Sequence, residues 1–255
     1  MKRQTYSLLS GAMLAVTLLL FSCHSSYEVT QIEGGRIPMD STWDAHPDAE
    51  AAALLAPYKA QIDSMMYQVM GTAEISMDRF RPESPLSNLV ADVLREAATC
   101  VQGKPADMGL VNVGGIRNSL TEGSITIGNI YEILPFENSL CVLTMKGTAM
   151  KQLFENIASR HGEGVSGIQL KISKEGKLLQ ATIAGKPVED DKTYTVATVD
   201  YLADGNDGMT ALVQADKRIC PENATLRSLF MKYVKKQTAA GKKISSKMEE
   251  RITIE

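Results

Sequence analysis

The sequence predicts an α+β fold, a single mixed-sheet domain with packed helices. Residues 192–199 alternate in polarity and are rich in β-branched side chains, which is typical of a strand. Residues 167–173 and 177–183 flank a turn at 174–176 and predict a β-hairpin. Residues 86–97 instead place apolar side chains at helical spacing. Strands and helices of both kinds along one chain favour the mixed class.

Composition limits the partners of this domain. The chain has 255 residues, of which 44% are hydrophobic, and this content is ample for the core of one domain. Its net charge of −3 argues against nucleic acid or an anionic surface as the main partner. Any anionic ligand must therefore be attracted by local cations.

Residues 1–22 predict a lipoprotein signal peptide. A basic start precedes an apolar run at 8–21, and Cys23 follows as in a bacterial lipobox. The run is short for a membrane-spanning helix, which needs about 20 apolar residues. A lipidated Cys23 would attach the chain to a membrane of the bacterial cell envelope, with the domain periplasmic or surface-exposed. An ordinary signal peptide with an incidental cysteine, or a transmembrane anchor, are the alternatives.

The next segments connect this anchor to the domain. Residues 23–48 are polar and contain glycine and proline, so they predict a tether. Residues 49–70 have apolar side chains at helical spacing and predict a linker helix, with Pro57 at a restart or a kink. We expect the apolar face of this helix to pack on the core; the alternative is a partner-binding stripe. The domain is expected over 71–255.

Within the domain, the helix at 86–97 has an N-terminal signal in Ser84 and Pro85. Residues 139–145 predict a strand and 146–159 a helix, after which His161 is expected as a helix-end residue. Asn223 is expected to cap a last helix.

Four cysteines are present, and three follow Cys23: Cys100, Cys141 and Cys220. Their spacing shows no close pairs, so buried thiols are expected. The alternative is a single disulfide, which could form in an oxidising compartment.

Residues 200–209, after the strand at 192–199, form the first candidate binding motif. They place an aromatic ring, Tyr201, and three aspartates on a stretch broken by Gly205 and Gly208. Glycine permits backbone angles closed to other residues and lets a ligand approach closely. A ring to stack a base and a carboxylate to accept ribose hydroxyls suit a nucleoside. The alternative is a glycine-rich surface turn.

Two further motifs supply complementary groups. Residues 112–117, Asn-Val-Gly-Gly-Ile-Arg, follow a strand-like run at 108–111. A guanidinium beside free backbone N–H groups suits a phosphate. Residues 134–138 add a second aromatic, Phe136, next to a proline and an amide.

Together these motifs resemble the C-terminal, substrate-binding domain of the 5′-nucleotidase family, metal-dependent enzymes that dephosphorylate nucleotides outside the cytoplasm. The resemblance rests on 112–117, 130–138, 165–168 and 193–208, in the family order, and spans roughly residue 55 to the C-terminus. It implies the 5′-nucleotidase C-terminal-domain type of fold.

The resemblance also implies roles for individual residues. Phe136 and Tyr201 would sandwich the base, with tyrosine where the family often has phenylalanine. Asp207 would accept from the ribose hydroxyls, and Asn138 would contact the nucleoside.

At the phosphate, the resemblance implies Asn112 and Arg117, with Gly114 and Gly115 in the turn between them. Arg81 resembles the family's second phosphate arginine, although Arg79 lies two residues away.

Metal chemistry is expected elsewhere. Fused family members carry a metallophosphatase domain, whereas this sequence has three scattered histidines without metal-ligand spacing. We expect no cofactor or catalytic residue in this chain, and divalent metals on a separate metallophosphoesterase chain. The alternative is a non-catalytic nucleotide- or nucleoside-binding lipoprotein. A metal-independent hydrolase is disfavoured because Ser119 and Ser166 have no histidine at recognisable spacing.

Overall fold

The computed structural model describes residues 28–255, and it divides the chain into two units, 1–52 and 53–255. The predicted signal peptide at 1–22 and the predicted lipidation site Cys23 lie outside the described residues. In the first unit, residues 28–52 are exposed, and their first regular element is the 3-10 turn η1, Trp43–Ala45. No described helix is long and apolar enough to cross a membrane.

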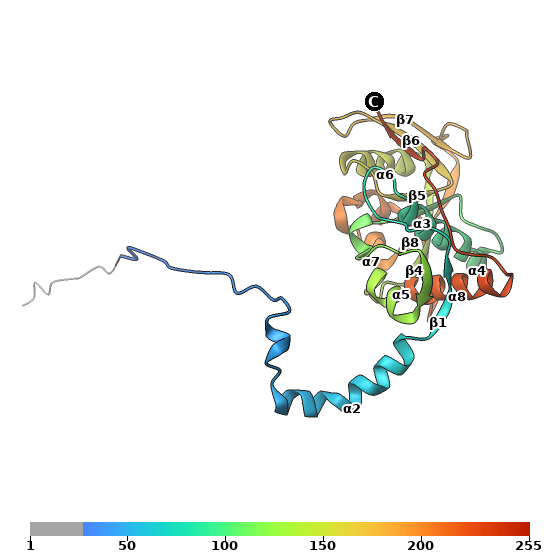
Figure 1. Ribbon diagram of the computed structural model, residues 1–255. Coiled ribbons are helices and arrows are strands. Elements are labelled where there is room, and N and C mark those ends of the chain that lie inside the picture. The colour runs from blue at the N-terminus through green and yellow to red at the C-terminus, as the bar shows by residue number, and fades with distance from the viewer. Residues whose placement is uncertain (1–27) are drawn as a thin grey trace, which may run out of the picture. The chain divides into compact units, whose positions relative to one another are not determined.

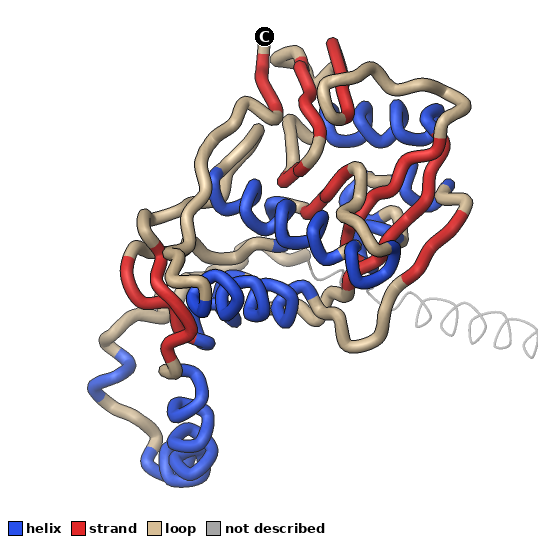
Figure 2. The backbone as a smooth tube through the Cα atoms, turned by 90° about the vertical axis from the view of Figure 1, so that its right-hand side faces the viewer, coloured by secondary structure: helices blue, strands red, loops and turns tan. Residues whose placement is uncertain are grey.

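The second unit alternates helices and strands (Figures 1 and 2). The α-helices are α2 (Ala49–Met66, which starts in the first unit), α3 (Pro85–Ala97), α4 (Thr99–Gln102), α5 (Ile127–Ile133), α6 (Gly147–Ser159), α7 (Asp200–Ala203) and α8 (Leu226–Ala239). The strands are β1 (Val69–Ala73), β2 (Met108–Val111), β3 (Gly123–Thr126), β4 (Leu140–Lys146), β5 (Gly164–Ser166), β6 (Ile168–Ile172), β7 (Leu178–Ile183), β8 (Thr193–Val199), β9 (Lys217–Ile219) and β10 (Ile252–Ile254). The short 3-10 turns are η2 (Val113–Gly115), η3 (Asn206–Gly208) and η4 (Thr210–Gln214).

A five-stranded sheet of order β5-β2-β8-β4-β9 forms the centre of the fold. Strands β2 and β8 are parallel, and the remaining neighbours are antiparallel, so the sheet is mixed as predicted. Helices α3 and α6 both pack against β8, and every residue of β2 and β5 is buried. The α+β class is therefore confirmed.

Helix α3 begins as its sequence predicts. The Ser84 hydroxyl accepts from the Ser87 backbone N–H, and the Ser87 hydroxyl accepts from the Ser84 N–H, which completes a capping box before Pro85. The helix lies very close to β2, because a Cβ atom on Gly109 would come within 2.4 Å of the Ala91 carbonyl oxygen. Only glycine fits at this crossing.

Two smaller sheets complete the domain. Strands β6 and β7 form the predicted hairpin, whose turn contains Gly176 at φ 77°, and β10 joins β6 in parallel. Strands β1 and β3 form an antiparallel ribbon that the sequence did not reveal. Both of its strands are short, so periodicity was a weak signal there.

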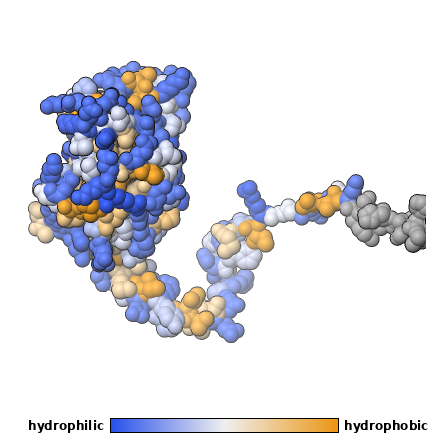
Figure 3. Space-filling model, turned by 180° about the vertical axis from the view of Figure 1, so that it is seen from behind, coloured by the Kyte–Doolittle hydropathy of each residue, from blue (hydrophilic) through white to orange (hydrophobic). Residues whose placement is uncertain are grey.

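The linker helix differs from the prediction in its end and in its burial. Helix α2 ends at Met66 rather than residue 70, because Val69–Ala73 pairs with β3. Pro57 lies inside the helix without ending it. The expectation that its apolar face packs on the core is wrong. No residue of α2 is buried, and Leu54, Tyr58 and Ile62 are 69%, 63% and 48% exposed. Hydrophobic residues are visible at the surface in the space-filling view (Figure 3).

The cysteine expectation is also corrected. Cys141 on β4 and Cys220 after β9 form a disulfide, although 79 residues separate them in the sequence. They meet because β4 pairs with β9, with Val142 opposite Ile219. Cys100 is a free thiol and is exposed, rather than buried. Sequence spacing could not reveal a contact made through sheet pairing.

The cap of the last helix is shifted by two residues. Thr225, not Asn223, caps α8, because its hydroxyl accepts from the Ser228 N–H at 3.2 Å. Asn223 instead takes a left-handed conformation at φ 56° in the preceding turn. Asparagine tolerates this conformation better than most residues.

Candidate functional site

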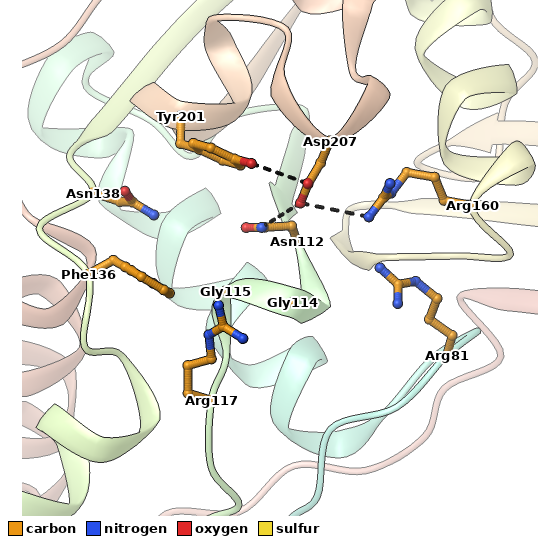
Figure 4. A pocket seen from close by; sticks show the side chains of 10 residues that line it. All are labelled: Arg81, Asn112, Gly114, Gly115, Arg117, Phe136, Asn138, Arg160, Tyr201 and Asp207. Atoms are coloured by element: carbon orange, nitrogen blue, oxygen red, sulfur yellow. Dashed lines mark hydrogen bonds and ion pairs between the residues drawn. The ribbon is translucent and has the colours of Figure 1, made fainter. Parts of the chain in front are cut away.

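One pocket gathers the motifs that the sequence separates. Its volume is about 440 Å³, within the range of small-molecule sites. Figure 4 shows the ten residues that line it: Arg81, Asn112, Gly114, Gly115, Arg117, Phe136, Asn138, Arg160, Tyr201 and Asp207.

Two aromatic rings lie on one side of this pocket. Phe136 follows α5 in the connection to β4, and Tyr201 lies on α7 directly after β8. Their side chains face the cavity with Asn138 beside them (Figure 4), and the two residues are 42% and 40% exposed. Large rings left this open to solvent are suited to stacking on a planar ligand.

The segment that carries Phe136 is fixed by a buried cation, Arg227 of α8. Its Nη1 donates to the carbonyls of Leu134 and Pro135 at 3.2 and 3.1 Å, and its guanidinium forms an ion pair with Glu137. The same guanidinium lies 4.0 Å from the centroid of the Tyr131 ring. These contacts hold the Leu134 and Pro135 carbonyls before Phe136 and the Glu137 side chain after it.

Tyr201 and Asp207 are connected across their loop. The Tyr201 hydroxyl donates to the Asp207 carboxylate at 3.3 Å, and the negative charge of Asp207 raises the pKa of Tyr201. Asp207 takes a left-handed conformation at φ 53°, between Gly205 at 84° and Gly208 at 75°. This backbone requires the glycines that mark the motif, and it turns the Asp207 carboxylate toward the cavity.

The Asn112 amide also holds Asp207, donating to it at 2.8 Å. Asn112 begins the turn η2, in which a Cβ atom on Gly115 would come within 2.7 Å of Asn112 Oδ1. A Cβ atom on Gly114 would meet nothing within 4 Å, so this glycine leaves the pocket open. Among the residues described, Asn112 Oδ1 is buried and accepts no hydrogen bond.

Arg117 is the last residue of the 112–117 motif and lies beside the Phe136 ring. Its backbone N–H donates to the Ile133 carbonyl at 2.8 Å, which joins the turn to the end of α5. Its guanidinium lies 5.1 Å from the centroid of the Phe136 ring, a cation–π contact. The cation is thus held beside the stacking surface.

The opposite side of the pocket carries two arginines, Arg81 and Arg160 (Figure 4). Both donate to one buried carboxylate oxygen of Glu163, each at 2.6 Å. The hydrogen bond to Glu163 raises the pKa of Arg160, and Arg160 also lies 3.7 Å from Asp207. Arg81 lines the pocket and Arg79 does not, which identifies the pocket arginine of that segment.

All nine residues that the sequence predicts for substrate binding line this one pocket. Sequence reasoning missed Arg160, because an arginine at the end of a predicted helix is ordinarily explained by the helix dipole. It also missed Glu163 and Arg227, which are buried below the lining and belong to no motif.

Two neighbouring features remain outside the pocket. The N-terminal residues of α3, Ser84 to Ser87, are not part of its lining, so they give no support to a phosphate there. His161 follows α6 as predicted, in a left-handed conformation at φ 60°, with its Nε2 3.1 Å from the Lys174 carbonyl. Residues 28–255 contain no group of three or more histidine, cysteine, aspartate or glutamate side chains that could hold a metal ion.

Comparison with known proteins identifies the family of this domain. Residues 67–214 match the family model described as 5′-nucleotidase, C-terminal domain, which covers more than half of the chain. The chain belongs to this family. The predicted resemblance is thereby confirmed at the level of the domain.

Individual relatives share this domain at moderate identity. Endonuclease YhcR of Bacillus subtilis is 33% identical over 165 residues, covering 62% of this chain and 13% of that protein. Cell wall protein Lmo0130 of Listeria monocytogenes is 29% identical over 240 residues, covering 83% of this chain and 30% of that protein. The crystal structure of a 5′-nucleotidase precursor from Thermus thermophilus is similar with a TM-score of 0.69 and 28% identity, covering 83% of this chain and 44% of that one. The chain thus spans less than half the length of each of these proteins.

Proposed function

We propose that this chain is the nucleotide-recognising half of a 5′-nucleotidase-type phosphohydrolase, and that its pocket holds a nucleoside or nucleotide. The convergence of all nine predicted residues on one cavity of about 440 Å³ carries the proposal. A purine or pyrimidine would stack between Phe136 and Tyr201. Each stacked base gains about 1–3 kcal/mol in nucleic-acid binders, so a two-sided clamp would supply much of the affinity.

The polar groups then follow the chain of a nucleotide outward from the base. Asn138 would contact the nucleoside, and Asp207 would accept from the ribose hydroxyls in the middle of the pocket. Asp207 is already aimed by Asn112 and by the Tyr201 hydroxyl, so little ordering is left for the moment of binding.

The phosphate would lie on Arg81 and Arg117, beside the backbone of Gly114 and Gly115. Guanidinium groups recognise phosphate through directed, charge-assisted hydrogen bonds. The open space above Gly114 leaves the backbone accessible to such an anion.

Calorimetric titration of residues 24–255 with AMP and with adenosine, in chelator, tests this assignment. We expect both to bind and AMP to bind more tightly. Because the described residues hold no group of three or more side chains that could bind a metal ion, repeating the titration with Mn²⁺ should leave the adenosine affinity unchanged. Failure of both ligands to bind would reject the proposal.

We further propose that hydrolysis uses a separate metallophosphoesterase chain, which supplies divalent metals and the attacking water. The exposed apolar side chains of α2 support this, since a partner docked on the helix would bury them. The alternative function, a nucleotide- or nucleoside-binding lipoprotein without catalysis, predicts instead that α2 is buried against its own core, whereas no residue of α2 is buried.

The test of the two-chain proposal is phosphate release from AMP by candidate metallophosphoesterases of the same compartment, with and without this chain. Release should rise on mixing. It should fall back when Leu54 and Tyr58 are both replaced by serine, whereas Lys59→Ser on the same helix serves as the control. No gain on mixing contradicts the proposal.

We also propose that Cys23 is lipidated and anchors the chain in the bacterial envelope. Nucleic acid is not among the proposed partners. The printed name of the Listeria relative, a cell wall protein, agrees with an envelope location. The described part of the tether, residues 28–48, is exposed throughout. Cys23→Ala should move the protein from the membrane fraction to the soluble fraction, and unchanged fractionation would reject the anchor.

A further inference from the structure

We propose that Glu163 is a positioning residue that assembles Arg81 and Arg160 into a phosphate-binding pair. The inference deepens the proposed function and rests on it. It adds Arg160 to the phosphate contacts, and it assigns a role to a carboxylate that does not line the pocket.

The geometry of Glu163 is that of a shared anchor. Its side chain is fully buried, and its Oε1 accepts from Arg81 Nη2 and from Arg160 Nε, each at 2.6 Å. Its Oε2 accepts from the Val113 backbone N–H, also at 2.6 Å. One carboxylate thus connects three segments of the pocket wall: the approach to α3, the end of α6, and the turn of Gly114 and Gly115.

Charge explains why such an anchor is needed. Two guanidinium groups side by side repel one another, and a buried carboxylate between them removes that repulsion. The Glu163 carboxylate is fully buried, so the loss of either arginine would leave it with less compensating charge.

The directions of the bonds leave donors for a ligand. Arg81 uses Nε for the Gly162 carbonyl, at 2.8 Å, and Nη2 for Glu163. Arg160 uses Nε for Glu163, and its Nη2 forms a longer ion pair with Asp207 at 3.7 Å. Guanidinium has five N–H donors in a rigid fork, so fixing one edge of each fork aims the remaining nitrogens. Figure 4 shows the two forks adjacent at the wall opposite Phe136.

A phosphate monoester is the ligand chemistry that suits this pair. With the base between the rings and the ribose at Asp207, the far side of the pocket receives the 5′ substituent. Its oxygens would accept from both forks and complete their hydrogen bonds from the pocket side.

Glu163→Gln separates this role from two others, because each predicts a different response to AMP and adenosine. If Glu163 positions the arginines, AMP affinity falls about tenfold, the loss of one or two charged hydrogen bonds, while adenosine affinity is kept. If Glu163 were only a neighbouring negative charge, its loss would strengthen AMP binding. If it only held the fold together, both ligands would weaken alike. Either of the last two results overturns the inference.

Controls keep the outcome interpretable. Glu155→Gln removes the same charge from an exposed position on α6 and should change neither affinity. Arg160→Gln tests the pair when Glu163→Gln does not fold, because Arg160 is only partly buried. It should lower AMP affinity about tenfold and leave adenosine affinity unchanged.

The double variant Arg160→Gln/Glu163→Gln should lose no more AMP affinity than Glu163→Gln alone, since the two residues act as a unit. Additive losses would overturn the inference. If the unmodified chain binds neither ligand, the proposed function itself is rejected. If the unmodified chain binds AMP and the Glu163→Gln chain binds it equally well, only the role of Glu163 is rejected.

Discussion

The two sides of the pocket are built in different ways. On the ring side, Phe136 follows α5 and Tyr201 lies on α7. The backbone there is held by Arg227 and by the pairing of β4 with β8. On the arginine side, Arg81 lies in an irregular segment and Arg160 follows the end of α6. There a single carboxylate, Glu163, joins the segments.

The difference teaches how each kind of recognition is held in place. Stacking needs a ring on a firm backbone, so the supports of the ring side act on carbonyl groups and strands. Phosphate recognition needs directed donors, so the support of the arginine side acts on the side chains themselves. Each side has one buried charged residue, of opposite sign.

The largest expected effect concerns the Cys141–Cys220 disulfide, which joins β4 to the segment after β9. Replacing Cys141 and Cys220 together by alanine releases a loop of 79 residues. Such a loop corresponds to about 4 kcal/mol of unfolding free energy in the chain-entropy model. Thermal or urea unfolding measures it. Cys100→Ala, at an exposed free thiol, is the matched control and should leave stability unchanged. Equal stability of both variants would show that β9 is held without the bond.

Arg227→Met tests the support of the ring side. The variant keeps the apolar stem but leaves the buried Leu134 carbonyl without its donor, which should cost about 2 kcal/mol of stability. AMP and adenosine should weaken together, because Phe136 loses its fixed backbone. Calorimetry and urea unfolding provide the two readouts. A loss of affinity confined to AMP would mean that Arg227 supports phosphate binding rather than the aromatic rings.

Tyr201→Ala removes one ring and should lower the affinity for adenosine and for AMP by the same factor, roughly tenfold or more. Tyr201→Phe keeps the stacking face and removes only the hydroxyl that contacts Asp207, so its effect should be much smaller. If alanine and phenylalanine variants bind equally well, stacking is not the contribution of this residue.

Arg117→Ala should lower AMP affinity about tenfold through the lost charge-assisted contacts, and adenosine affinity should stay the same. Arg79→Ala removes one positive charge from a residue outside the pocket lining and should change neither. Equal losses of AMP and adenosine with Arg117→Ala would contradict its assignment to the phosphate.

Much of the pocket lining was predicted from the sequence. The ring side and the Asn112 to Arg117 turn were predicted because glycines, aromatics and a strand end coincide within short segments. The N-cap at Ser84 and the β6–β7 hairpin were likewise local signals. Local chemistry is what a single sequence expresses most directly.

The remainder depends on contacts between distant segments. Glu163 meets Arg81 across 82 positions, and Arg227 meets Leu134 across 93. The Cys141–Cys220 disulfide likewise depends on the pairing of β4 with β9. No periodicity or spacing encodes such partners, so the supporting residues became visible only in the fold.

A crystal structure of residues 24–255 with AMP would test the central claim most directly. The account predicts the adenine between Phe136 and Tyr201, the ribose hydroxyls on Asp207, and the phosphate within hydrogen-bonding distance of Arg81, Arg117 and Arg160. AMP bound with its phosphate at the rings, or outside this pocket, would contradict it.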